Sequence, residues 1–249
     1  MKYMKAMLVG IVQGVTEFLP VSSSGHLTLL AKFGVMPTSL FYNLALHLAT
    51  LAAVLLSTRK EIAEILRHPI NGDGKYILIA SIPTVGIAFL FKALSPELLT
   101  GRLLGFGFLL TAGLLFLTET VGRDSKGRML DAKISFLTGV MQGVAVLPGV
   151  SRSGATLAAL RSSGVEGERA ATFSFLLSVP VIVGGFLLEG VESGFSAAGA
   201  DGGEIAVAAI SAFLSGLLSV KFMMKQIKKG FKPFIPYLIA LGVLAYFVA

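Results

Sequence analysis

The stretch GIVQGVTEFLPVSSSG at residues 10–25 returns 129 positions later as GVMQGVAVLPGVSRSG at residues 139–154. Eight of the sixteen aligned positions are identical, including a glutamine and the motif VSxSG. Each copy interrupts an apolar segment with a proline and clustered hydroxyl groups. In lipid, such a break frees backbone groups that must be satisfied inside the protein or beside a water-filled cavity. The two copies therefore predict a duplicated unit with two broken helices inside a membrane protein.

Composition independently indicates a membrane protein. Of the 249 residues, 54% are hydrophobic and only 14% are charged, whereas a typical soluble domain has about 25% charged residues. A soluble enzyme and a nucleic-acid-binding module are therefore poor interpretations, despite a net charge of +7. We expect an all-α integral membrane protein with no nucleic-acid partner. The chain has no cysteine, which excludes disulfides and cysteine-ligated zinc.

Six further apolar runs are each 16 to 19 residues long, close to the length that a membrane-spanning helix needs. They cover residues 40–57, 76–92, 102–120, 170–188, 204–222 and 234–249. The limbs of the broken segments, at 7–34 and 134–163, are about 13 residues or shorter and reach only part of the way across. We predict a single membrane domain, 1–249, in which each repeat is a re-entrant broken hairpin followed by three transmembrane helices. Repeat 1 covers about 1–120 and repeat 2 about 134–249.

The distribution of Lys and Arg tests this topology, because cytoplasmic loops carry an excess of both. If the broken segments are re-entrant, 15 cations lie on one side and 5 on the other, whereas full crossings give 10 against 10. The re-entrant arrangement is therefore favoured, and it places both termini outside. It has an odd number of crossings per repeat, so the second repeat is inverted and the two polar tips can meet near the midplane.

Glu17 is the most informative residue of the first tip. An acid inside an apolar hairpin is costly and by default functional, although a carboxylate that reaches solvent or pairs with a buried cation is a structural alternative. Gln13 lies one helical turn earlier and faces the same way. Ser22 and Ser23 precede His26 by four and three residues, so a helix that starts here presents two hydroxyls and an imidazole on one face. Such a group can supply a nucleophile and a base, or Ser22 is only a helix cap and His26 only a buried histidine.

The second tip carries a cation instead of an acid. Arg152 cannot lose its charge, so at this depth it needs an anionic partner, either Glu17 or a bound phosphate. Ser151, Ser153 and Thr156, together with nearby glycines and a helix N-terminus, favour a phosphate. The two repeats thus share a scaffold but divide the ionisable groups between them. That division favours an active site at the repeat interface over a symmetric channel.

The segments QGVTEFLPVSSSGH at 13–26 and PGVSRSGAT at 148–156 resemble the motifs of the undecaprenyl-pyrophosphate phosphatase family, also known for bacitracin resistance. The resemblance covers essentially the whole chain. It implies a multi-pass enzyme of the plasma membrane that hydrolyses undecaprenyl (polyprenyl) pyrophosphate to the monophosphate and phosphate. The reaction would recycle the lipid carrier of cell-wall synthesis, in a site open to the outer face.

The resemblance also implies a divalent cation, Mg²⁺ or Ca²⁺, and makes four positions essential: Glu17, Ser23, His26 and Arg152. The substrate-binding residues that we expect beside them are Gln13, Ser22, Ser151, Ser153 and Thr156. Glu17 is the candidate metal ligand, together with Gln13. The family more often has an acid at the position of Gln13, so this chain has one charged ligand fewer for a metal.

Several alternatives stay open at this point. The nucleophile is Ser23 with His26 as base, or His26 itself, or water. A transporter or lipid flippase is the rival from another class, because inverted repeats and broken midplane helices are typical of secondary transporters. A homodimer is a further expectation. His47 and Asn43, one turn apart on the first full span, either line the cavity or bond another helix.

Overall fold

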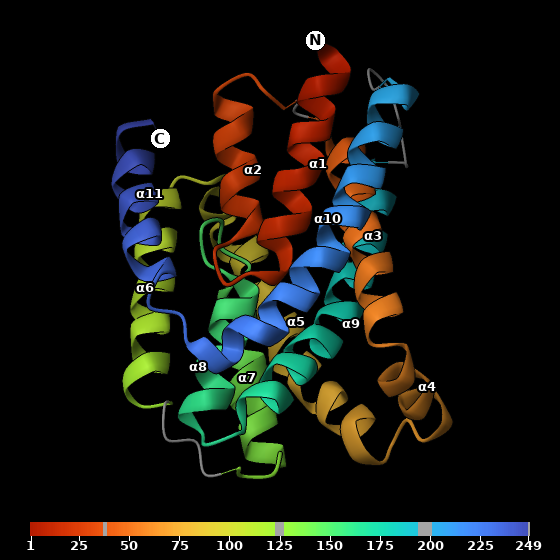
Figure 1. Ribbon diagram of the computed structural model, residues 1–249, viewed down its shortest axis with the longest axis vertical. Coiled ribbons are helices and arrows are strands. Elements are labelled where there is room, and N and C mark those ends of the chain that lie inside the picture. The colour runs from red at the N-terminus through yellow and green to blue at the C-terminus, as the bar shows by residue number, and fades with distance from the viewer. Residues whose placement is uncertain (37–38, 123–126, 194–200, 249) are drawn as a thin grey trace.

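The computed structural model describes residues 1–36, 39–122, 127–193 and 201–248, and these residues are helical apart from short connections. The all-α prediction is therefore confirmed for the described residues. In chain order the helices in Figure 1 are α1 (Lys2–Phe18), α2 (Ser23–Lys32), α3 (Leu40–Ser57), α4 (Arg59–Arg67), α5 (Gly72–Leu94), the 3₁₀ helix η1 (Pro96–Thr100), α6 (Leu104–Thr120), α7 (Ala132–Val144), α8 (Arg152–Ser162), α9 (Gly167–Ser193), α10 (Gly202–Lys229) and α11 (Phe234–Val248).

Within the described residues, all six apolar runs coincide with helices almost throughout, but these helices differ in length. In α5, α9 and α10 the apolar segments are 23, 22 and 28 residues long, enough to span a bilayer. The pair formed by α3 and α4 is a fourth candidate span, and it bends by 81° between the two helices. Helices α6 and α11 are apolar but shorter, at 17 and 15 residues. The chain is thus a multi-pass membrane protein in which three to four spans are supported by length and composition.

Both predicted breaks are present, and the helix that follows each break begins with the same kind of serine cap. The chain breaks between α1 and α2 and again between α7 and α8. Ser22 and Ser151, which occupy matched positions of the two copies, directly precede α2 and α8. Each serine side chain accepts a hydrogen bond from the backbone N–H three residues later. This cap satisfies one of the N–H groups that a helix start leaves without a partner.

The two broken hairpins approach from opposite ends of the molecule, and their breaks meet near its centre. Figure 1 shows α1 and α2 at the upper end and α7 and α8 at the lower end. Ser153, near the start of α8, donates to the carbonyl oxygen of Leu19 in the first break at 3.0 Å. Thr111 of α6 braces the second break, because its hydroxyl donates to Gly149 O and accepts from Ser151 N. Residues that are far apart in sequence therefore come together at the tips.

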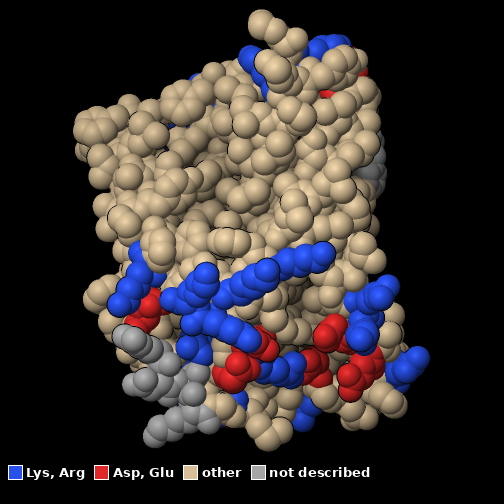
Figure 2. Space-filling model, viewed as in Figure 1, with Lys and Arg blue, Asp and Glu red and all other residues tan. Residues whose placement is uncertain are grey.

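Charged side chains gather at the two ends of the molecule, and in Figure 2 most of them lie at the lower end. At the end that holds α4, the Arg169 guanidinium bonds both carboxylate oxygens of Asp73. Asp73 and Arg169 belong to two connecting segments that the re-entrant topology places on the same, cation-rich side of the membrane. At the opposite end Lys2 pairs with Asp201. Two cations of the count, at 123 and 126, lie outside the described residues.

Small residues allow α1 to pack closely against α10. Gly10 and Gly14 face Ala208, Ala212 and Ser215 so tightly that a Cβ at either glycine would overlap atoms of α10. Close packing between small residues stabilises helix pairs in lipid, where the hydrophobic effect does not drive helices together. The first broken helix is thereby held beside a long apolar helix.

Candidate active site

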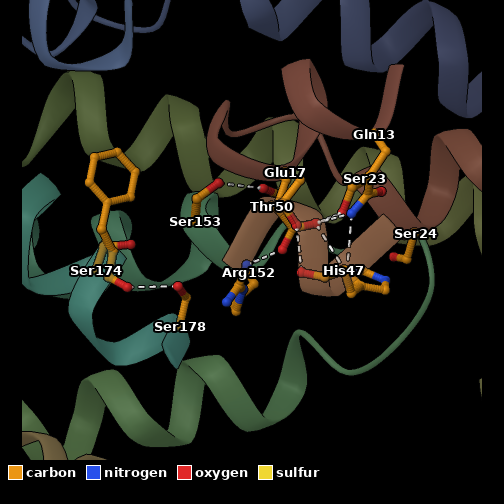
Figure 3. Close-up of polar contacts among 12 residues, drawn as sticks. Gln13, Glu17, Ser23, Ser24, His47, Thr50, Arg152, Ser153, Ser174 and Ser178 are labelled. Atoms are coloured by element: carbon orange, nitrogen blue, oxygen red, sulfur yellow. Dashed lines mark hydrogen bonds and ion pairs between the residues drawn. The ribbon is translucent and has the colours of Figure 1, made fainter. Parts of the chain in front are cut away.

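Glu17 lies near the end of α1, and its side chain is only 3% exposed. Its Oε2 accepts hydrogen bonds from Ser23 Oγ at 2.6 Å and from Gln13 Nε2 at 3.0 Å. Its Oε1 accepts a hydrogen bond from Arg152 Nη2 within an ion pair. Figure 3 shows these side chains converging from α1, α2 and α8. The acid of the first tip therefore meets the cation of the second tip instead of reaching out to solvent.

Arg152 is the first residue of α8, and 17% of its side chain is exposed. Its Nη2 is bonded to Glu17, whereas its Nη1 is buried and has no hydrogen-bond partner among the described residues. A buried charged donor without a partner is costly, so this nitrogen favours the approach of an anion. The ion pair with Glu17 thus occupies one side of the guanidinium and leaves Nη1 available for a phosphate oxygen.

A cavity of ≈ 250 Å³ lies beside this pair. Its lining is polar in one part and apolar in another. The polar lining residues are Thr16, Glu17, Ser22, Ser23, Ser24, His47, Gln142, Ser151 and Arg152, and the apolar ones are Leu44, Ala145, Val146, Val150, Val181, Ile182, Gly185 and Phe186. A lining of this kind suits a ligand with a charged head and an apolar chain.

The five residues predicted to bind substrate divide into two groups. Ser22 and Ser151 line the cavity, whereas Gln13, Ser153 and Thr156 do not. Thr156 donates to the backbone of its own helix and contacts Ser174 Oγ at 2.7 Å. Ser153 bonds across the two tips, and Gln13 donates to Glu17. The second group therefore supports the shape of the site without facing the cavity.

His26 does not form the expected pair with a serine hydroxyl. Its Nδ1 lies 2.7 Å from the carbonyl oxygen of Ser22, and its Nε2 lies 2.7 Å from the hydroxyl of Tyr237 in α11. It is not among the residues that line the cavity. Of the two alternatives, Ser22 is indeed a helix cap and His26 is a buried histidine with both nitrogens bonded. The structure instead places the hydroxyl of Ser23 against Glu17.

His47 of α3 belongs to the site, although the sequence left its place open. Its Nδ1 lies 3.2 Å from Gln13 Nε2 and 3.6 Å from Glu17 Oε2, and its side chain lines the cavity. Figure 3 shows it beside Glu17 and Ser23. The sequence feature that could have identified His47 is its place in an apolar span, because ionisable residues are rare in lipid unless they face a polar interior.

Comparison with known proteins points to one family. The chain matches the family described as bacitracin resistance protein BacA over residues 6–244. It belongs to the BacA family. Relatives named undecaprenyl-diphosphatase include one from Carboxydothermus hydrogenoformans, which is 40% identical over 92% of this chain and 90% of its own length. Another, from Thermosipho africanus, is 38% identical over 98% of this chain and 100% of its own length. A third, from Korarchaeum cryptofilum, is 33% identical over 92% of both chains.

The residues of this BacA-family site do not by themselves form a binding site for Mg²⁺ or Ca²⁺. Both ions prefer several oxygen ligands. Among the described residues, Glu17 is the carboxylate that lines the cavity, and its two oxygens already accept hydrogen bonds from three side chains. Gln13 adds only a neutral oxygen, Oε1, which is buried without a partner in the described part of the chain. No group of three or more His, Asp or Glu side chains suited to a metal occurs among the described residues.

Proposed function

We propose that this protein hydrolyses undecaprenyl pyrophosphate to the monophosphate and phosphate, and so recycles the lipid carrier of cell-wall synthesis. The observation that carries the proposal is the unpartnered Nη1 of Arg152 beside the hydrogen bond from Ser23 to Glu17. The part-polar, part-apolar cavity suits a pyrophosphate head on an isoprenoid chain. Relatives named undecaprenyl-diphosphatase are 33–40% identical to this chain, which supports the same activity here.

Two helix starts and one cation hold the phosphates. Ser23 and Arg152 are the first residues of α2 and α8, and both line the cavity, so both helix N-termini lie beside it. The N–H groups and the positive dipole end of a helix start attract anions. Arg152 Nη1 supplies the charged donor, with the hydroxyl of Ser151 nearby in the lining. The isoprenoid chain follows the apolar lining.

Ser23 is the nucleophile, and Glu17 accepts its proton. The hydroxyl already donates to Glu17 Oε2 at 2.6 Å, the distance that general-base activation needs. Ser23 Oγ attacks the terminal phosphorus, the phosphoserine bond forms, and the anhydride P–O bond to the lipid monophosphate breaks. Water then attacks the phosphorus of the phosphoserine, the Oγ–P bond breaks, and Glu17 returns its proton to Ser23 Oγ, which restores the hydroxyl and releases phosphate. Of the other nucleophiles, His26 has both nitrogens hydrogen-bonded and does not line the cavity. Direct attack by water would leave no phosphoserine to trap.

The two repeats, about 1–120 and about 134–249, are inverted relative to each other within one membrane domain. The approach of the two hairpins from opposite ends and the matched serine caps support this arrangement. The end that carries most of the cations faces the cytoplasm. Both chain ends then lie outside, and the cavity opens toward the outer face of the plasma membrane. A homodimer is a further proposal, which cross-linking in membranes tests.

A requirement for Mg²⁺ or Ca²⁺ stays a proposal that rests on family resemblance. Because the residues present form no complete site, a bound cation would take most of its oxygen ligands from the pyrophosphate and from water. Phosphate release measured with and without a chelator, in the presence of each ion, tests the requirement.

The full chain, purified in detergent and given undecaprenyl pyrophosphate, tests the activity. We expect phosphate release by the wild type and loss of that release in Glu17→Ala. A protein that releases no phosphate but moves the lipid across liposome membranes would belong to the rival class, the transporters.

A further inference from the structure

The ring of His26 is hydrogen-bonded at both nitrogens, by the backbone carbonyl of Ser22 and by the hydroxyl of Tyr237. A carbonyl oxygen only accepts, so the bond to Ser22 O at 2.7 Å puts a proton on Nδ1. In the neutral ring Nε2 is then an acceptor, and the Tyr237 hydroxyl donates to it at 2.7 Å. Tyr237 lies 211 positions from His26 in the chain. The contact therefore ties the last helix to the first broken hairpin.

Packing holds the same ring in place. The ring of Tyr237 stacks on it with centroids 5.9 Å apart, and the ring of Phe108 stands edge-on to it at 5.7 Å. His26 is only 9% exposed. Gly25 lets Phe108 approach, because a Cβ there would lie 2.6 Å from the Phe108 ring. An imidazole enclosed in this way has no free nitrogen for a proton from Ser23.

The carbonyl that His26 binds belongs to a strained part of the backbone. Ser22 has φ +69° and ψ +96°, and it is the only non-glycine residue with positive φ in the described part of the chain. An L residue keeps such a conformation only where its surroundings hold it. His26 supplies two of these restraints, since its backbone N–H donates to Ser22 O at 3.2 Å and its Nδ1–H donates to the same oxygen.

Ser22 directly precedes Ser23, so its backbone sets the direction in which the Ser23 side chain leaves the helix start. We propose that Tyr237 and His26 are positioning residues for Ser23. Tyr237 holds the Nδ1-protonated ring, and the ring holds the Ser22 carbonyl. The fixed backbone of Ser22 then aims the Ser23 hydroxyl at Glu17. This role rests on the phosphatase function proposed above, and it gives His26 a task other than that of a base.

The first test removes only the Tyr237 hydroxyl, which donates a hydrogen bond to His26 Nε2. Tyr237→Phe keeps the stacked ring but loses the donor to Nε2, so we expect kcat to fall about 3- to 10-fold with KM within about twofold. Tyr246→Phe on the same helix is the matched control, because Tyr246 is 80% exposed. We expect no change in that variant. Equal kcat values in Tyr237→Phe and Tyr246→Phe would refute the role of Tyr237.

The second test separates a positioning role of His26 from a base. The amide nitrogen of His26→Asn can take the place of Nδ1 and donate to Ser22 O, whereas that of His26→Gln reaches toward the place of Nε2. We expect His26→Asn to keep kcat within about 10-fold of the wild type, and His26→Gln to lose about 100-fold through misplacement of Ser23. Comparable inactivity of two folded variants would identify His26 as a base instead. Melting temperatures in detergent show whether each variant is folded.

A third measurement does not depend on turnover. The chain contains three histidines, and ¹⁵N NMR of histidine-labelled full-length protein, with His26→Asn used to assign the signal, reports the tautomer of His26. We expect the Nδ1-protonated form in the wild type and a shifted Nε2 signal in Tyr237→Phe. An Nε2-protonated ring in the wild type would overturn the inference even if the enzyme is active. A protein that shows the expected tautomer but releases no phosphate would instead overturn the proposed function.

Discussion

Glu17 and Arg152 form a part-buried ion pair although 135 positions separate them in the chain. Ser23, which occupies in the first copy the position that Arg152 occupies in the second, contacts the other oxygen of the same carboxylate. Ser23 and Arg152, which occupy matched positions of the two copies, therefore both contact Glu17, an acid that only the first copy carries. The shared scaffold supplies the geometry, and the unequal residues supply an acid, a hydroxyl and a cation at one point.

Loss of the Arg152 guanidinium should reduce phosphate release severely. Removal of one donor that stabilises transition-state charge typically costs about 10²–10³-fold in kcat. Arg152→Ala also leaves the buried Glu17 carboxylate without its cation, which costs up to about 3–5 kcal/mol of stability. Arg152→Lys is therefore the more informative variant, because it keeps the positive charge and loses the two-pronged hydrogen-bond donor geometry of the guanidinium. Arg161→Lys, at the far end of α8, is the matched control, and equal rates in the two lysine variants would contradict the role of Arg152.

A covalent phosphoserine is expected at Ser23. Ser23→Ala should lower kcat by at least about 1,000-fold, because it removes the nucleophile. Ser24→Ala should lose much less, since the Ser24 hydroxyl contacts Ser22 Oγ at 3.3 Å and not Glu17. Acid quenching with substrate labelled in the terminal phosphate, followed by peptide mapping, checks the intermediate. Label that never appears on the protein would favour direct attack by water.

Gln13→Glu should increase the affinity of the site for a divalent cation. The amide of Gln13 now donates to Glu17 Oε2 at 3.0 Å. A second carboxylate at this point repels Glu17 unless a cation lies between them, and cation affinity rises with ligand charge. The Mg²⁺ concentration for half-maximal phosphate release should therefore fall. Gln226→Glu, near the C-terminal end of α10 and not among the residues that line the cavity, is the comparison; an equal shift in both variants would contradict a local effect.

Two glycine-to-alanine changes should alter stability in opposite directions. In Gly14→Ala the added Cβ overlaps Ala212 O and Ser215 Oγ of α10, so we expect a loss of about 1–3 kcal/mol. At Gly113 a Cβ meets nothing within 4 Å, so Gly113→Ala should gain about 0.5–1 kcal/mol through helix propensity. Unfolding midpoints in one detergent check both changes. Equal shifts in the two variants would show that α1 does not pack on α10 as described.

The cap of α7 should make stability depend on acid pH. The pKa of the Asp131 carboxyl lies below its ordinary value of 3.8, because the carboxyl accepts a hydrogen bond from the Ile134 backbone N–H and also bonds Arg128. Folding is therefore favoured above the unfolded-state pKa, and this contribution is lost as the pH falls through the lower folded-state value. Asp131→Asn keeps a capping oxygen without the charge. Its melting temperature should approach that of the wild type between about pH 5 and pH 3, and a difference that is constant over this range would contradict the assignment.

Much of the site was predictable because its chemistry is local. Pro20 and the capping serines end and restart helices through their own backbone and side chains, so the breaks follow from short segments. Glu17 and Arg152 could be singled out for the same reason, since a charge in an apolar segment is costly wherever the segment packs. The pairing of these two charges was one of two alternatives, because sequence spacing does not reveal how two hairpins meet.

The two histidines show where local reasoning ends. His26 and His47 both lie in apolar helices, and only the rotation and neighbours of each helix decide which ring faces the cavity. The structure turns His47 toward Glu17 and encloses His26 between Phe108 and Tyr237.

The sequence alone determined the membrane class, the duplicated broken hairpins and the division of charges between the tips, because hydropathy, capping and internal repetition are properties of short segments. Only the tertiary structure decided which hydroxyl meets the acid, which histidine lines the cavity and which helix braces the first tip. Those relationships join α1, α2, α3, α8 and α11 across distances in the chain that no local pattern records.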